Sequence, residues 1–369
     1  MSHNSIHIAG AGLAGLSAAI GLARRGHRVE VFEKNADSGA ARHSDWDAIE
    51  NWTTEADMLG LLGDWGIAPS FEHRSKLDFE VYDNAGVRYP VTTPRPFFYL
   101  LKRGPDRGSV EQELKRQAID YGIAIHYRQP RERKDVDIWA AGSQHGGFFL
   151  GVGMTFRTSH PDLVLGLVST HAAPKAYAYL VIVDGEGTLS VVLTRDFKQA
   201  RTYLNRSIAI FRKAKQFNMD EVKMTSGFGG LASAFWQPAS RPIVVGEAAG
   251  FQDFLWGFGI RYALFSGHLA ARALDEGLDY EALVEREIRP LVRSSMVNRT
   301  LYDWAGDRTY RALIRRFSAS PNLPQLTRRW YRGLAFRHLV WPIAQRRYRT
   351  LKQRLERDSA AYLRGPSGS

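Results

Sequence analysis

The sequence predicts an α/β protein that combines a parallel sheet, a separate antiparallel sheet and a helical C-terminal appendage. Three observations predict this fold class: a glycine-rich turn follows the first apolar stretch, a second such turn lies more than two hundred residues later, and Lys and Arg accumulate after residue 300. With 369 residues, 44% of them hydrophobic, the chain is long enough for two domains. It contains no cysteine, so thiolate chemistry is excluded and any redox reaction requires a bound cofactor.

The N-terminal residues 5–35, SIHIAGAGLAGLSAAIGLARRGHRVEVFEKN, have the pattern of strand, glycine turn, helix and strand. The spacing G-x-G-x-x-G provides a tight turn, room for a pyrophosphate and close packing of the helix on the strand. An acid eighteen residues after the last glycine can accept the hydroxyls of a ribose. The pattern predicts a dinucleotide site, without distinguishing FAD from NAD. Its residues are Gly10, Gly12, Ala14, Gly15, Glu33 and Lys34.

The middle of the chain alternates between two kinds of sequence pattern. Ser109 is a suitable N-cap for an amphipathic helix that ends near Gly122, and a buried strand over 137–141 closes on Gly142. Other segments alternate polar and apolar residues around turns such as Asn84–Gly86, which is typical of antiparallel strands. We therefore expect a discontinuous nucleotide-binding domain (1–70, 100–145 and 241–285), an inserted substrate domain (71–99 and 146–240) and a basic helical region (286–369).

The second glycine-rich turn lies in residues 241–260, RPIVVGEAAGFQDFLWGFGI. A buried strand, Ile243–Val245, precedes it and ends at Glu247, and an Ala- and Leu-rich helix is expected to start near Gly259. The order is again strand, glycine turn and helix, so this segment has the same predicted arrangement as the N-terminal one.

Three motifs occur in a characteristic order and spacing: the N-terminal G-x-G-x-x-G with its acid, the strand that closes on Gly142, and the second glycine-rich turn. Together they resemble the FAD-dependent oxidoreductases of the aromatic-hydroxylase superfamily, most closely its geranylgeranyl-reductase-like branch. The resemblance covers about residues 1–275 and implies a Rossmann-type FAD-binding domain. It implies that the late acid contacts the ribityl chain of the flavin and that the following helix N-terminus faces the pyrimidine end of the isoalloxazine. The chain differs from the family in having Glu247 in place of an aspartate, no proline after the late turn and only a reduced substrate-sheet motif at 177–182. Further cofactor residues implied are Arg42, Arg103, Gly142, Gly246, Glu247, Gly257, Gly259 and Ile260.

The same resemblance implies an enzyme that transfers hydride through flavin N5 and acts on a small hydrophobic, lipid-like or isoprenoid substrate. NADPH or NADH is the expected electron donor. An oxygen-dependent flavin monooxygenase is the main alternative, and a flavin-binding protein without turnover is a third. No catalytic acid or base and no metal ligand are assigned. Residues expected at the substrate, for which core packing is an equal or better explanation, are His43, Tyr177, Tyr179, Trp256 and Phe258.

The C-terminal region carries almost all the net charge of the chain. Residues 301–369 hold fifteen Lys or Arg against four Asp or Glu, a net of +11 out of +12. Basic residues interleaved with Trp and Leu are compatible with a peripheral helix on an anionic membrane, and equally with an appendage packed on the body that exposes its arginines. Neither a nucleic-acid motif, a membrane-spanning stretch nor a signal peptide is recognised, so we expect a cytoplasmic protein; under the membrane alternative it would lie peripherally on the inner membrane face. The oligomeric state stays open.

Overall fold

The computed structural model describes residues 5–142, 147–230, 242–332 and 339–348. The N-terminal domain is built on a parallel sheet with the strand order β15-β9-β1-β2-β8. The strands are short, and the central ones, β1 and β2, bury most of their apolar residues, as expected for parallel strands covered on both faces. Its strands are β1 (Ile6–Ala9), β2 (Val29–Glu33), β8 (Ala124–Tyr127), β9 (Ile138–Trp139) and β15 (Ile243–Val244). The strand that precedes the late glycine turn therefore lies in the same sheet as the strand that precedes the first one.

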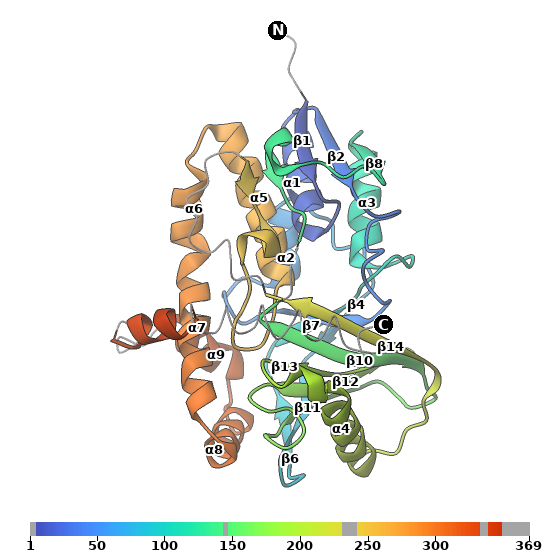
Figure 1. Ribbon diagram of the computed structural model, residues 1–369, viewed down its shortest axis with the longest axis vertical. Helices are drawn as coiled ribbons and strands as arrows, with labels where there is room; N and C mark the ends of the chain where they lie inside the picture. The colour runs from blue at the N-terminus through green and yellow to red at the C-terminus, as the bar shows by residue number, and fades with distance from the viewer. Residues whose placement is uncertain (1–4, 143–146, 231–241, 333–338, 349–369) are drawn as a thin grey trace.

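A second sheet of seven strands forms the lower half of the molecule in Figure 1. Its order is β14-β10-β13-β12-β11-β5-β6, antiparallel throughout except where β11 pairs with β5. The predicted hairpin around Asn84–Gly86 is confirmed as β5–β6. The strands are β5 (Asp78–Asp83), β6 (Arg88–Thr92), β10 (Phe149–Arg157), β11 (Leu163–Val168), β12 (Tyr177–Val183), β13 (Glu186–Leu193) and β14 (Asp220–Gly229).

A three-stranded antiparallel sheet, β3-β7-β4, lies between the two larger sheets and was not predicted. The predicted boundary at residue 100 between the substrate and nucleotide-binding segments falls within the central strand of this small sheet, residues 98–102. The strands are β3 (Trp46–Glu50), β4 (His73–Lys76) and β7 (Phe98–Lys102). The remaining elements before the appendage are α1 (Leu13–Ala23), α2 (Met58–Asp64), α3 (Val110–Asp120), α4 (Ala200–Ala214), α5 (Ile260–Glu276), and the 3-10 turns η1 (Arg133–Asp135), η2 (Phe197–Gln199) and η3 (Gly246–Ala249).

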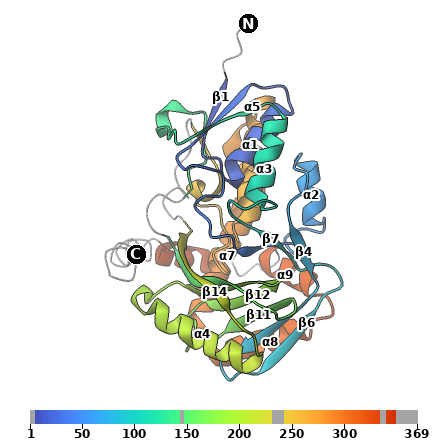
Figure 2. The ribbon, with the colours of Figure 1, turned by 90° about the vertical axis from the view of Figure 1, so that its right-hand side faces the viewer.

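Helices α1 and α5 follow the two glycine turns and pack side by side (Figures 1 and 2). Their backbones approach so closely that a methyl group on Gly267 would lie 2.3 Å from the carbonyl oxygen of Ala14. A methyl group on Gly246 would lie 2.8 Å from the Ala14 side chain. The Ser17 hydroxyl also donates to the Leu264 carbonyl over 2.7 Å. Small residues therefore allow the two glycine turns to lie close together, although the turns are far apart in the sequence.

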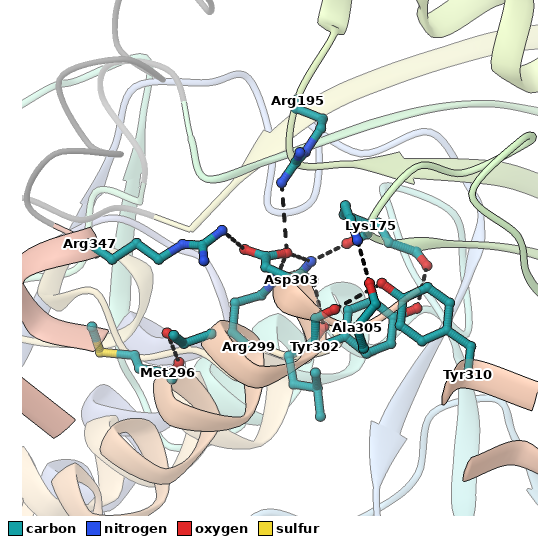
Figure 3. Close-up of polar contacts among 12 residues, drawn as sticks. Lys175, Arg195, Met296, Arg299, Tyr302, Asp303, Ala305, Tyr310 and Arg347 are labelled. Carbon is teal, nitrogen blue, oxygen red and sulfur yellow. Dashed lines mark hydrogen bonds and ion pairs between the residues drawn. The ribbon is translucent and has the colours of Figure 1, made fainter. Parts of the chain in front are cut away.

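The C-terminal appendage runs along one side of the molecule and reaches from the parallel sheet to the antiparallel one (Figure 1). In Figure 3, Arg299 donates to Asp303 on the next turn and to the carbonyl of Lys175, just before β12. Arg347 donates to the other oxygen of Asp303 over 3.2 Å. Its helices are α6 (Tyr280–Glu287), α7 (Arg289–Trp304), α8 (Asp307–Ser318) and α9 (Leu323–Arg332), and residues 339–348 are also helical.

Two further contacts fix the appendage on the body. Arg311 of α8 donates to Asp83 in the β5–β6 hairpin over 2.9 Å, and Tyr331 of α9 donates to Asp253 in the late glycine loop over 2.6 Å. The described part of the appendage is therefore packed on the body. Packing on the body was the second of the two alternatives considered for the basic region. None of the helices in the described ranges is long and apolar enough to cross a membrane. Residues 349–369, which hold part of the predicted basic region, lie outside the described residues.

The α1–α5 contact can be tested with a pair of glycine-to-alanine substitutions. Gly267→Ala forces the two helices apart and is expected to lower the free energy of unfolding by about 1–3 kcal/mol. Gly60→Ala is the matched control, because Gly60 lies on α2 where a methyl group meets no atom within 4 Å, and it is expected to raise stability by about 0.5–1 kcal/mol. Denaturant unfolding measures both. An unchanged midpoint for Gly267→Ala would contradict the packing described.

Candidate cofactor and substrate site

The first glycine turn and the acid at the end of β2 meet as the sequence analysis expected. Glu33 is buried, and its Oε2 accepts the backbone N–H of Ala11 in the turn over 2.9 Å. Its Oε1 accepts the backbone and side-chain N–H groups of Asn35. The carboxylate is therefore held beside the turn, and its Oε2, which accepts one hydrogen bond, can still accept another from a ligand hydroxyl. Lys34 follows it and is exposed.

Helices α1 and α5 both begin at a glycine that leaves the helix N-terminus open. Gly12 is the N-cap of α1 and Gly259 is the N-cap of α5, and neither first turn has a side-chain cap. A methyl group on either glycine would meet no atom within 4 Å, so packing within the described protein does not require glycine there. Unpaired N–H groups and the positive end of the helix dipole make such a terminus suitable for an anionic or electron-rich group. Gly142, after β9, is open in the same way.

The late loop is a closed turn built around a buried aspartate. The Asp253 carboxylate accepts the backbone N–H of Trp256 over 2.6 Å, and its backbone N–H donates to the carbonyl of Phe258 over 2.8 Å. Gly257 has φ +84°, a conformation that favours glycine. These contacts take the place of the proline that the related motif has. Ile260 begins α5 and is buried.

Glu247 does not extend the preceding strand, because Gly246–Ala249 form a 3-10 turn. Its Oε1 accepts the backbone N–H of Gly230, after β14, over 2.8 Å. The acid therefore bridges the late turn and the antiparallel sheet. Its contact with a ribityl chain stays a prediction.

The two arginines implied as cofactor contacts lie in a network of carboxylates. Arg103 is 4% exposed and donates to Glu111 over 2.6 and 2.8 Å and to Asp47 over 3.1 Å. Arg42 is more exposed and pairs with the same Asp47 over 3.3 Å. Burial and the neighbouring Asp47 raise the pKa of Asp45, with both arginines opposing the rise. Arg103 thus has a structural role between β7 and α3, while the guanidinium of Arg42 remains available to a ligand.

Four of the five expected substrate residues are linked through ring contacts or a shared apolar group, since the Tyr177 ring lies 6.2 Å from that of Tyr179 and 5.7 Å from that of Trp256. Tyr179 and Phe258 belong to an aromatic and aliphatic group with Trp52, whose ring lies 5.1 Å from Phe258. We call this group the aromatic wall; it consists of Trp46, Trp52, Phe79, Phe97, Phe98, Tyr179 and Phe258.

Tyr177 and Trp256 connect the aromatic wall to the appendage. The Tyr177 hydroxyl donates to the carbonyl of Trp256, and the Trp256 ring then packs on Tyr302 of the appendage. His43 is exposed and hydrogen-bonds the carbonyl of Ser226 over 3.2 Å. Enclosure by the protein, together with the carboxylate of Asp47, raises the pKa of Tyr177, so this phenol stays protonated.

Sequence reasoning missed a buried acid beside the aromatic wall. Glu50 ends β3 and is 1% exposed, and neither carboxylate oxygen has a hydrogen-bond partner among the described residues. Burial raises its pKa to about 7, opposed by the charge of Arg261. Burial likewise raises the pKa of Asp253 to about 6. The sequence contains one indication of this burial. Glu50 follows the apolar Trp46 by four residues, so the two side chains lie on the same face of a strand, but this strand was not predicted.

The chain was compared with known families and solved structures. Residues 8–52 match a family described as the NAD(P)-binding Rossmann-like domain. A geranylgeranyl bacteriochlorophyll reductase-like protein from Thermoplasma acidophilum is 15% identical, with a TM-score of 0.67 over 94% of this chain and 98% of its own. The chain therefore shares the fold of this reductase-like protein. The predicted fold class, a Rossmann-type domain with an antiparallel sheet and C-terminal helices, is confirmed.

Two further structures have the same fold. A flavoprotein/dehydrogenase from Cytophaga hutchinsonii is 15% identical, with a TM-score of 0.63 over 95% of this chain and 98% of its own. A probable FAD-dependent monooxygenase from Pseudomonas aeruginosa is 16% identical, with a TM-score of 0.56 over 85% of this chain and 99% of its own. No curated protein sequence matches the chain. Reductase-like and monooxygenase proteins are therefore equally compatible with this fold.

The buried acid predicts a pH-dependent stability. With a folded pKa of about 7 against an ordinary value of 4.5, folded Glu50 retains a proton that the unfolded chain releases, so stability falls as pH rises between these values. Glu50→Gln removes this penalty. Its stability relative to the unsubstituted protein should rise from near zero at pH 4.5 to about 3 kcal/mol at pH 8. Thermal or denaturant unfolding at several pH values measures the difference, with the exposed Glu132→Gln as control. A difference that does not change with pH would show that Glu50 is solvated.

Proposed function

We propose that this protein binds FAD and is an FAD-dependent oxidoreductase acting on a hydrophobic substrate. The observation that carries the proposal is the pair of helices α1 and α5, which pack together and both start at an uncapped glycine with open space before it. Two such termini suit a ligand that carries a diphosphate at one point and an electron-rich ring at another, because each terminus can bind one of these groups. FAD is a dinucleotide with both groups.

The residues present fit this cofactor. Glu33 is held where it can accept the hydroxyls of the adenosine ribose, and the N-terminus of α1 at Gly12 can bind the pyrophosphate. Gly259, where a methyl group would meet no described atom within 4 Å, leaves room for a flat ring at the start of α5. When bound, FAD supplies hydride exchange through its N5 atom, and the helix N-terminus stabilises the negative charge of the reduced ring.

The chain's own side chains would shape the substrate space. The aromatic wall offers an apolar surface that excludes water and favours a hydrophobic, lipid-like or isoprenoid substrate. Glu50, with its pKa near 7, is suited to hold or deliver a proton if the substrate reaches it. Asp253 fixes the loop that presents Trp256 and Phe258. We assign it a positioning role.

A monooxygenase is the second candidate, favoured by the structural likeness to a probable FAD-dependent monooxygenase. Hydroxylation consumes oxygen whenever substrate is converted, whereas reduction or dehydrogenation by hydride transfer proceeds without oxygen. Oxygen uptake measured with NADPH or NADH, in the presence and absence of an apolar substrate, therefore separates the two. A flavin that no donor and no substrate reduces would favour the third alternative, a flavin-binding protein without turnover. The nicotinamide donor and peripheral membrane contact remain predictions.

The FAD site is tested by placing a carboxylate at the start of α1. Gly12→Asp provides a good N-cap and meets no protein atom, so stability should change by no more than about 1 kcal/mol. Its negative charge occupies the proposed pyrophosphate position, and FAD affinity should fall at least about tenfold. The flavin bands retained after reconstitution and gel filtration measure the loss. Gly306→Asp, at the uncapped N-terminus of α8 where a methyl group likewise meets no described atom, adds the same charge away from the site and should retain FAD. No flavin bands in the unsubstituted protein would overturn the proposal.

A further inference from the structure

A pocket on the appendage side of the molecule is distinct from the two glycine turns. It is lined by Thr54 and Glu55, from the segment between β3 and α2, and by three arginines of α9, Arg328, Arg329 and Arg332. We propose that this pocket binds a phosphate or diphosphate group. The phosphate can belong to a soluble phosphate ester or to a lipid headgroup, because both present the same oxygens to a guanidinium.

The spacing of the arginines on α9 directs them to one place. Arg328 and Arg332 are four residues apart and therefore lie on the same face of the helix, with Arg329 beside them. Arg328 pairs with Glu55 over 2.8 Å, and the Glu55 side chain is 85% exposed at the rim. For Arg329 and Arg332 no hydrogen bond or ion pair is found within the described part of the chain. The lining thus has three guanidinium groups and one exposed carboxylate.

A fourth arginine lies beneath the lining. Arg261, on the first turn of α5, is 5% exposed, and its hydrogen-bond contacts with other described residues are two long ones of 3.5 Å, to Met58 Sδ and to the Thr54 hydroxyl. Thr54 is itself a lining residue, so the Arg261 guanidinium lies one contact behind the lining of the pocket. Burial and the nearby Arg332 lower the pKa of Arg261, with Glu50 opposing the fall. A buried cation with such weak partners is costly unless an anion approaches it.

The charge balance favours phosphate over a carboxylate. Three arginines line the pocket with the single carboxylate of Glu55. Behind the lining, Arg261 interacts electrostatically with the buried Glu50, whose raised pKa leaves it partly neutral at pH 7. A dianion compensates this excess of positive charge better than a monoanion, and its oxygens can accept bidentate bonds from more than one guanidinium. The site is also rigid, because Tyr331, between Arg329 and Arg332, is anchored to Asp253 over 2.6 Å.

The test measures pyrophosphate binding by calorimetry on the full chain as purified, with its flavin content checked by the visible spectrum. Arg329→Gln/Arg332→Gln should weaken the binding at least about tenfold. Arg316→Gln, which removes a charge from the exposed side of α8, should change it less than about twofold. Glu55→Gln removes the opposing carboxylate and should tighten binding by about threefold or more. The variants compare the same protein with and without these side chains, so the outcome does not depend on whether FAD binds.

Vesicles distinguish the two sources of phosphate. Co-sedimentation is measured with phosphatidylcholine vesicles with and without phosphatidic acid. Loss of pyrophosphate binding in the double variant, with vesicle binding unchanged, supports a soluble phosphate ester. Loss of binding to phosphatidic acid in the double variant but not in Arg316→Gln supports a lipid headgroup. Binding of neither probe, or binding that the double variant and Arg316→Gln alter equally, overturns the proposal.

Discussion

Helices α1 and α5 can approach each other as they do only because the residues between them are almost without side chains. Gly267 lies against the backbone of Ala14, and Gly246 lies against its side chain. This contact brings together the two glycine turns, which are far apart in the sequence. With them it brings together the two uncapped N-termini of α1 and α5. Any larger residue would separate the termini, and with them the two ends of the proposed FAD site.

Buried carboxylates complete the frame that the helices begin. Glu111 holds Arg103 between α3 and the three-stranded sheet, and Asp253 closes the late loop. Both carboxylates accept several hydrogen bonds, which offsets the cost of removing them from water. Glu50 has no such partner among the described side chains and stays protonated to a higher pH instead. The same cost of burial therefore raises the pKa of both Glu50 and Asp253, whereas hydrogen bonds make Glu111 and Asp253 structural anchors.

The appendage is an integral part of this frame. It contacts the antiparallel sheet through Asp303 and Arg299 (Figure 3) and the late loop through Tyr331. Since Tyr331 binds the same Asp253 that shapes the loop, α9 and the start of α5 are positioned together. Part of the basic charge recognised in the sequence is thereby brought to a pocket beside Arg261.

The sequence by itself determined the elements whose signals are local. The glycine spacing, the acid at Glu33, the Ser109 cap and the hairpin at Asn84–Gly86 each follow from backbone geometry or hydrogen bonding within a few residues. Only the tertiary structure decided the burial of Glu50, the ion pairs of Arg103 and the pocket lined by α9. These depend on side chains brought together from distant segments, and the free energy of a charge is set by the neighbours that replace its water, which no local pattern contains.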